Sequence, residues 1–216
     1  MRAQDLRLEE LIEFTEGKVH IRQRRLILHS IHAFASLRKD LYNQMGPERT
    51  RGILTRFGYY WGEADAAAMK RIFKWKNTRE WLLAGIKIQS LQGVALGKAK
   101  SIQLGPPKEN IKIEIIWHNS SEAEEHLLAL GSVSYPVCWI LTGYASGYTS
   151  FCLNKNIIFM EKKCRAKGDH ICQATGKDIS SWGKIIDPYL KYFKKTDNIH
   201  QEITHLTQKL KKQNQK

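Results

Sequence analysis

The amino-acid sequence predicts an α+β fold, in which helices pack against a mixed β-sheet. Apolar residues recur at three- and four-residue spacing before residue 45, alternate with polar residues over 111–118, and form a hairpin pattern over 157–176. The chain has 216 residues, of which 42% are hydrophobic. It is therefore long enough and apolar enough to bury a substantial core.

Two helices are expected first. Residues 7–14 fit either a strand or a short helix, and Gly17 then turns the chain into a short extended segment. From residue 22 the spacing predicts a helix that ends at 46–47, where Gly-Pro is a stop signal. A second helix, rich in alanine, is expected over 49–72. The apolar positions of the first helix are Leu26, Ile27, Ile31, Phe34, Leu37 and Leu41.

A strand followed by a helix is expected in the middle of the chain. Ile111, Ile113, Ile115 and Trp117 fall on one face of the predicted strand, with polar residues between them. The serines at 120–121, with a glutamate soon after, are typical of a helix N-terminus. This pattern predicts a strand with one buried face that leads directly into a helix.

The segment from 135 to 176 predicts a helix and then a β-hairpin. Residues 135–153 fit a helix whose small residues, such as Gly143 and Gly147, permit close packing against a neighbour. The alternating stretch "IIFMEKKC" then turns at "AKGD" and returns in "HICQATG". The cysteines at 164 and 172 therefore face each other across the turn.

The C-terminal end predicts a linker helix over 191–216. Ile199, Ile203, Leu206 and Leu210 follow the alternating spacing of a coiled-coil seam, which is too short to hold a coiled coil alone. We expect three parts in the chain: residues 1–125, a lobe over 126–190 and the linker helix.

Charge and hydropathy exclude several classes of protein. The net charge of +14 favours contact with anions, but Lys and Arg are scattered and no DNA- or RNA-binding signature is present, so direct nucleic-acid binding is not expected. No stretch is long and apolar enough for a membrane span, and the polar start does not fit a signal peptide. A cytoplasmic location follows, where reduced thiols favour metal binding over disulfides.

The four cysteines indicate a metal site. If 138–152 is helical, Cys138 and Cys152 lie about 21 Å apart and cannot share one ion. Cys164 and Cys172 are paired by the hairpin, and either Glu161 or His170 can complete a four-coordinate zinc site. The alternative is that the cysteines are small buried hydrophobic residues.

The run "PVCWILTGYASGYTSFCLNKNIIFMEKKCRAKGDHICQATGK" resembles the 4-vinyl reductase type of sensor domain. This type lies at the N-terminus of sigma-54-dependent activators of aromatic catabolism, which respond to phenols, toluene or xylene. "RLILHSIHAFASLRKDLYNQMGPERTRGILTRFGYYWGEADA", "SLQGV" and "IWHNSSEAEEHL" follow the family's order, so most of the chain is covered.

The resemblance implies a structural zinc ion in the C-terminal lobe. Carried over by position, its ligands are Cys138, Glu161, Cys164 and Cys172, which leaves Cys152 outside the site. Four protein ligands leave no open position for an activated water, as is typical of structural zinc.

The resemblance also implies a buried apolar pocket for an aromatic effector. Trp117, Ile115 and Phe159 align with pocket residues, and Gln89 stands where the phenol sensors carry a histidine. Ordering the flexible amide of Gln89 would offset the gain from a hydrogen bond. We therefore expect weak phenol binding and a preference for a bulkier or less polar aromatic.

The function implied is that of a ligand-sensing regulatory domain without enzymatic activity. It would form a homodimer, bind a small aromatic or similar hydrophobic effector, and act on an output domain or the transcription machinery through the C-terminal helix. Neither a GxxxxGK[ST] phosphate loop nor a dinucleotide loop is present. The alternatives are a zinc-stabilised adaptor for protein partners and an enzyme related to 4-vinyl reductase.

Overall fold

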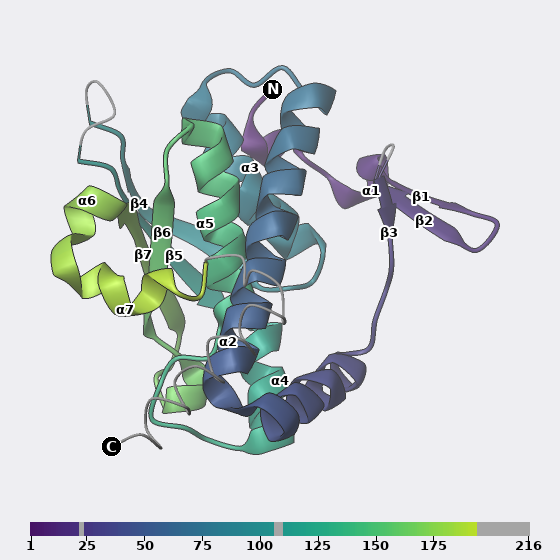
Figure 1. Cartoon of the computed structure of the whole chain (residues 1–216). Helices are drawn as coiled ribbons and strands as arrows, with labels where there is room; N and C mark the ends of the chain where they lie inside the picture. Colours follow the sequence, from purple (N-terminus) through teal and green to yellow (C-terminus); the bar gives the residue numbers. More distant parts are fainter. Residues whose placement is uncertain (22–23, 106–109, 194–216) are drawn as a thin grey trace, which may run out of the picture.

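The computed structural model describes residues 1–21, 24–105 and 110–193 (Figure 1). A four-stranded sheet and the helices packed on it form the body, and a small three-stranded sheet stands to one side. The elements in chain order are η1 (Ala3–Asp5), α1 (Leu8–Leu11), β1 (Ile12–Thr15), β2 (Lys18–Ile21), β3 (Arg24–Leu26), α2 (Ile31–Ile72), α3 (Thr78–Leu91), β4 (Leu96–Gln103), β5 (Lys112–His118), α4 (Ser121–Leu130), α5 (Trp139–Leu153), β6 (Ile157–Lys163), η2 (Arg165–Lys167), β7 (Cys172–Asp178), α6 (Ile179–Trp182), η3 (Gly183–Ile186) and α7 (Asp187–Leu190).

The α+β class is confirmed, but the expected mixed sheet is wrong. The strand orders are β1-β2-β3 and β4-β5-β7-β6, and every described pair of neighbours is antiparallel. The two helices between β5 and β6 return the chain in the same strand direction. β7 then inserts between β5 and β6, so these two strands never pair in parallel.

Helices cover both faces of the four-stranded sheet. α3 and α5 lie on the face that carries Ile113, Ile115 and Trp117, and all three residues are at most 4% exposed, as their alternation predicted (Figure 1). On the other face, the short helices from α6 to α7 cover Ile158. There the indole N–H of Trp182 donates to the carbonyl oxygen of Ile158 at 2.9 Å.

α2 and α5 pack with their backbones in direct contact. A Cβ atom on Gly143 would lie 2.1 Å from the carbonyl oxygen of Thr55, and one on Gly147 would lie 2.0 Å from that of Tyr59. Gly58 makes the reciprocal approach, because its Cβ would lie 2.2 Å from the carbonyl oxygen of Ile140. The predicted close packing of this helix is confirmed, and α2 and α5 have no room to separate side chains between them.

The first long helix begins later than its periodicity predicted. Residues 24–26 form β3, and α2 begins at Ile31, where the hydroxyl of Ser30 accepts from the backbone N–H of His32 at 3.2 Å. A serine that can cap the helix outweighs the matching apolar spacing ahead of it. The predicted break is confirmed at Gly46, whose φ of 74° interrupts α2 before Pro47.

Other predictions have mixed outcomes. Residues 7–14 contain both a short helix and a strand, and the 135–153 helix and the β6–β7 hairpin are confirmed. α3 and β4 were not predicted. The seam residues at 199–210 lie outside the described residues, and the three-part division of the chain stays a prediction. Among the described helices, none is long and apolar enough to cross a membrane.

Candidate metal centre and neighbouring pocket

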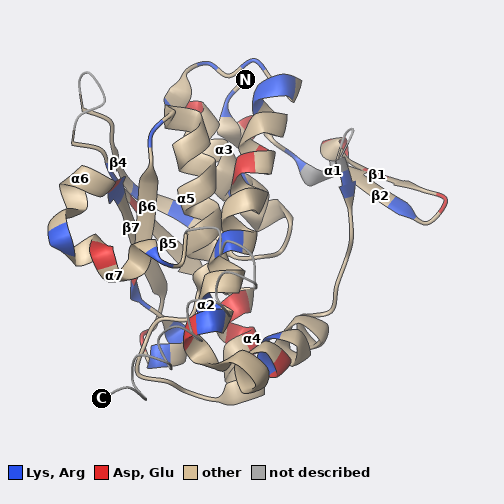
Figure 2. Cartoon of the chain, viewed as in Figure 1, with Lys and Arg blue, Asp and Glu red and all other residues tan. Residues whose placement is uncertain are grey.

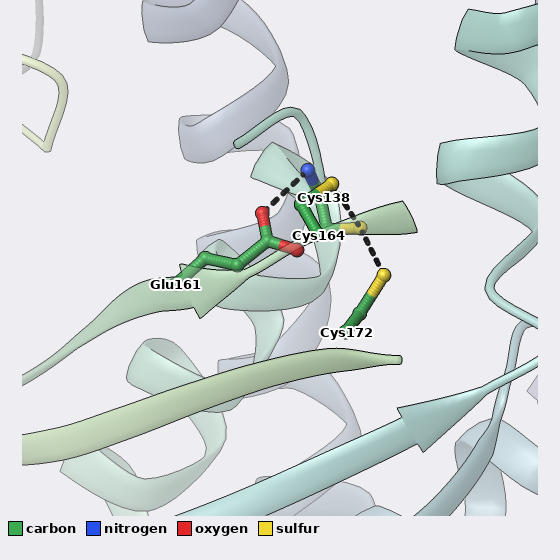
Figure 3. Close-up of side chains that lie close together, drawn as sticks. All are labelled: Cys138, Glu161, Cys164 and Cys172. Atoms are coloured by element: carbon green, nitrogen blue, oxygen red, sulfur yellow. Dashed lines mark hydrogen bonds between the residues drawn. The ribbon is translucent and has the colours of Figure 1, made fainter. Parts of the chain in front are cut away.

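Four side chains from three separate segments meet at one end of the four-stranded sheet (Figure 3). Cys138 precedes α5, Glu161 lies on β6, Cys164 follows β6, and Cys172 begins β7. Their ligand atoms all lie within 4.8 Å of one another. The sulfur of Cys138 lies 3.5 Å from that of Cys172 and 3.9 Å from that of Cys164. This cluster can hold a metal ion.

Hydrogen bonds orient the cluster without filling it. The backbone N–H of Cys138 donates to Oε2 of Glu161 at 2.9 Å, while Oε1 of Glu161 is buried and has no partner in the described part of the chain. The hydroxyl of Ser120 lies 3.3 Å from the sulfur of Cys138, and the N–H of Arg165 donates to the sulfur of Cys172 at 3.4 Å. One carboxylate oxygen is thus held in place while the other stays free to bind an ion.

Negative charge in this cluster is concentrated on one sulfur. Hydrogen bonds from the thiols of Cys138 and then Cys172 lower the pKa of Cys164 well below its usual range. Burial raises the pKa of Cys138, and burial followed by the charge of Cys164 raises that of Glu161. Thiolates are the form that binds metal, and a bound cation would stabilise the charged forms of the other ligands as well.

The two alternatives from the sequence lie elsewhere. Cys152 is in the last turn of α5, away from the cluster, where burial raises the pKa of its thiol. His170 is exposed in the loop between β6 and β7. The structure therefore brings together Cys138, Glu161, Cys164 and Cys172, and it does not bring Cys152 or His170 to them.

A small, mostly apolar cavity of about 20 Å³ lies between α3, α5 and the four-stranded sheet. Gln89 and Ile115 line it, whereas Trp117 and Phe159 are buried nearby without lining it. The ring of Phe159 covers Gly176, where a Cβ atom would lie 2.3 Å from the ring. The lining residues are Leu82, Gly85, Ile86, Gln89, Ile102, Ile113, Ile115, Tyr144, Ala145, Tyr148 and Thr149.

Gln89 presents an unused hydrogen-bond donor to this cavity. Its Nε2 is buried without a partner among the described residues. The hydroxyls of Tyr144 and Tyr148 instead donate to Asp65 and to the carbonyl oxygen of Trp81, each at 2.9 Å. Gln89 is only 2% exposed, so its side chain is already ordered before any ligand binds. The expected ordering cost on binding is therefore wrong, because folding has already met it.

The cavity and the metal cluster share one face of the sheet. Ile115 pairs with Ala174 across β5 and β7, and Ala174 pairs with Glu161 across β7 and β6. Directly paired residues point their side chains to the same face. The wall of the cavity and a candidate metal ligand are therefore one residue apart in this row.

A buried charged group was not predicted from the sequence. Nη2 of Arg38 lies 2.5 Å from Oε1 of Glu122, and Nη1 donates to the carbonyl oxygen of Val137 at 3.2 Å. The carboxylate of Glu122 also accepts from the N–H groups of Ile140 and Leu141, which fixes the start of α5 beside Cys138. Arg38 and Glu122 are 84 positions apart, so no local pattern points to this pair.

The pocket-facing tyrosines were missed as well, although the sequence held a signal for them. Tyr144, Ala145, Tyr148 and Thr149 recur at the spacing of one helix face, within the "GYASGY" block and just after it. Lys and Arg are spread over many elements and gather on no single one (Figure 2).

Comparisons with known proteins connect both sites to a known type of domain. A family model described as activator of aromatic catabolism matches residues 5–104, and the model of the 4-vinyl reductase domain matches residues 117–177. The chain is 32% identical over 207 residues to the phenol regulator MopR of Acinetobacter guillouiae, covering 96% of this chain and 37% of that protein. It is 31% identical over 191 residues to the transcriptional regulatory protein XylR of Pseudomonas putida, covering 88% and 34%. The chain thus spans about a third of the length of these relatives.

A solved structure agrees with this result. The phenol-responsive sensory domain of the transcription activator PoxR, determined with phenol, matches with a TM-score of 0.82 and 28% identity. The match covers 87% of this chain and 94% of that domain.

Proposed function

Because the chain carries an activator of aromatic catabolism domain over residues 5–104 and a 4-vinyl reductase domain over residues 117–177, we propose that it is an effector-sensing regulatory domain. It binds a small aromatic or similarly hydrophobic molecule and passes this event to an output domain or to the transcription machinery. The relatives are named as regulators and a sensory domain, which supports a regulatory and non-enzymatic role.

One observation carries the proposal: an enclosed, mostly apolar cavity with a single kind of unused polar group. The apolar lining favours a hydrocarbon ring, and the free N–H of Gln89 favours an effector with an acceptor oxygen. A buried donor without a partner is unfavourable by about 1 to 3 kcal/mol, which an effector oxygen would recover.

A thermal-shift assay with toluene, anisole and phenol tests this function. A ligand that binds only the folded state raises the melting temperature in a concentration-dependent way. Cyclohexane serves as the control for nonspecific partitioning. We expect at least one aromatic to raise the melting temperature more than cyclohexane does, and no response to any aromatic would contradict the function.

We further propose that the cluster of Cys138, Glu161, Cys164 and Cys172 holds a structural zinc ion. Tetrahedral zinc with Zn–S bonds of about 2.3 Å requires sulfur atoms about 3.8 Å apart. The separations of 3.5 and 3.9 Å support this fit, as does the free Oε1 of Glu161. When bound, the ion would neutralise the thiolates and tie the β6–β7 hairpin to the start of α5.

The three-stranded sheet supports a proposed homodimer. It stands apart from the four-stranded sheet (Figure 1), and both of its outer strands, β1 and β3, have an open edge among the described residues. Phe14, Ile27 and Leu28 are 67%, 72% and 69% exposed in this part of the chain. A second copy would cover such apolar side chains. Light scattering of the Ile27→Asp, Leu28→Asp double variant should give the monomer mass, and an unchanged dimer would place the interface elsewhere.

A further inference from the structure

The last described residues are fastened to α2 by four side chains, here called the exit clamp: Glu48, Arg51, Tyr189 and Tyr192. The guanidinium of Arg51 lies 4.8 Å from the ring centre of Tyr189 and 4.3 Å from that of Tyr192. The hydroxyl of Tyr192 bonds to both carboxylate oxygens of Glu48, at 2.9 and 2.7 Å. Tyr192 is only 7% exposed. The chain that continues past residue 193 therefore departs from a fixed point on α2.

The exit clamp lies beside the break in α2. Gly46, with φ of 74° and ψ of 169°, interrupts the helix two residues before Glu48. Such a break is a position where two helical segments can change their relative direction through few backbone dihedrals. The half of α2 that carries the clamp is thus able to move without unfolding the half that precedes it.

Tyr59 connects the same half of α2 to both α5 and the exit. Its carbonyl oxygen lies where a Cβ atom on Gly147 would be only 2.0 Å away, so the two backbones touch. Its ring meets that of Phe193 edge to face, with centres 6.0 Å apart. On its other side, α5 lines the cavity through Tyr144, Ala145 and Tyr148. A displacement of α5 therefore has to displace α2, and α2 carries the exit clamp.

The cavity is too small for an aromatic ring in this conformation. Its volume is about 20 Å³, enough for one water molecule, whereas a benzene ring occupies a cavity on the order of 150 Å³. Entry of a ring must move a wall outward. α5 forms one wall, and its glycine contacts transfer the movement to α2.

We propose that the exit clamp is closed when the cavity is closed, and that binding of an aromatic effector opens both. This inference rests on the proposed function. Arg51 and Tyr192 are positioning residues in it, because they contact neither the cavity nor the metal cluster. Coupling between two sites is reciprocal. Weakening the clamp must therefore make the cavity easier to open and must tighten effector binding.

Calorimetric titration and hydrogen exchange of the whole chain test the proposal together. The variants are Tyr192→Phe, which keeps the ring but removes the bond to Glu48, and Arg51→Gln, which removes the cation over both rings. Lys112→Ala is the matched control, because it removes a surface ion pair of 3.1 Å on β5. The probes are toluene, anisole and phenol.

We expect both clamp variants to bind the probes about two- to tenfold more tightly than the wild-type protein, as suits the loss of one net hydrogen bond or ring contact. Lys112→Ala should leave the affinity unchanged. In the wild-type protein, a bound probe should speed amide exchange over 189–193, and the variants should exchange fast without any probe. Equal affinities in all four proteins would overturn the clamp alone. Failure of every protein to bind any probe would overturn the proposed function and the clamp with it.

Discussion

Trp117 on β5 and Cys172 on β7 are directly paired across the antiparallel sheet. Their side chains therefore point to the same face, and the indole of Trp117 is completely buried with its N–H unpartnered among the described residues. A candidate effector residue and a candidate metal ligand are thus immediate neighbours. Loss of the metal should loosen the strand that Trp117 packs against.

The first prediction follows for Cys164→Ser. We expect this variant to lose its zinc and to lose about 4 kcal/mol or more in the free energy of unfolding, because metal binding of this kind is folding free energy. Cys152→Ser is the matched control, since Cys152 lies in the last turn of α5, outside the cluster. Elemental analysis and urea unfolding measure the two effects. Zinc retained in Cys164→Ser, or lost in Cys152→Ser, would show that the ligand set is wrong.

The second prediction concerns the contact between α2 and α5. Gly143→Ala places a Cβ atom 2.1 Å from the carbonyl oxygen of Thr55, and neither backbone can move aside freely. We expect a loss of about 3 kcal/mol in the free energy of unfolding. Gly52→Ala is the control within α2, because its nearest atom, at 3.1 Å, is the end of the flexible Arg56 side chain.

In Gly52→Ala, the higher helix propensity of alanine should offset the small crowding, so the change should stay within about 1 kcal/mol. Chemical denaturation of both variants decides the matter. Equal stabilities would mean that the helices separate without cost and do not move as one body.

These two regions differ in how far the sequence could predict them. The strand from Ile113 to Trp117 was predictable because one buried face produces strict alternation. The start of α2 was not, because Leu26 and Ile27 match the helical spacing although the cap is Ser30. Sheet order was also out of reach, since the insertion of β7 between β5 and β6 depends on tertiary packing.

The candidate metal site was more accessible to sequence reasoning than the pocket. Cys164 and Cys172 are joined by a local hairpin, so their proximity follows from turn geometry, while Cys138 required the family resemblance. Gln89 comes from α3, which was not predicted at all. The free state of its Nε2 depends on which neighbours fold around it, and no local pattern contains that information.

The third prediction is a loss of stability between about pH 6.5 and 8, caused by Glu125. Burial, followed by the charge of Glu122, raises the pKa of Glu125 from 4.5 to about 8. A carboxyl with a raised pKa stabilises the fold in its protonated form, fully below 4.5, and this contribution is lost as the pH rises through about 8. Burial lowers the pKa of His126 from 6.5 to about 4, which gives the opposite slope only below 6.5.

Urea unfolding at pH 6.5 and pH 8 measures this effect. The slope is limited to about 1.4 kcal/mol per pH unit for one group, so we expect a decline of about 1 to 2 kcal/mol in the wild-type protein. Glu125→Gln should remove the decline, and Glu124→Gln, at an exposed neighbouring position, should keep it. A decline that persists in Glu125→Gln would assign it to another group.

The fourth prediction concerns effector selectivity at Gln89. Its free N–H rewards an acceptor, whereas the hydroxyl hydrogen of phenol needs an acceptor of its own. We expect anisole, which is bulkier and accepts without donating, to bind more tightly than phenol. Gln89→Leu should remove the preference for anisole over ethylbenzene, which is about 2- to 10-fold for one net hydrogen bond. Gln89→His should raise phenol affinity, and an unchanged order of ligands in both variants would exclude a role for this position.

Calorimetric titration of the wild-type protein and of Ala145→Leu with toluene, anisole and phenol tests the central claim most directly. Ala145 lines the cavity on α5 and is 5% exposed, so a leucine there fills the space that an effector needs. Circular dichroism and elemental analysis establish that the variant keeps its fold and its metal. The account predicts that the wild-type protein binds at least one of these aromatics and that Ala145→Leu binds it at least about tenfold more weakly. Equal binding by the two proteins would contradict the claim that this cavity is the effector site.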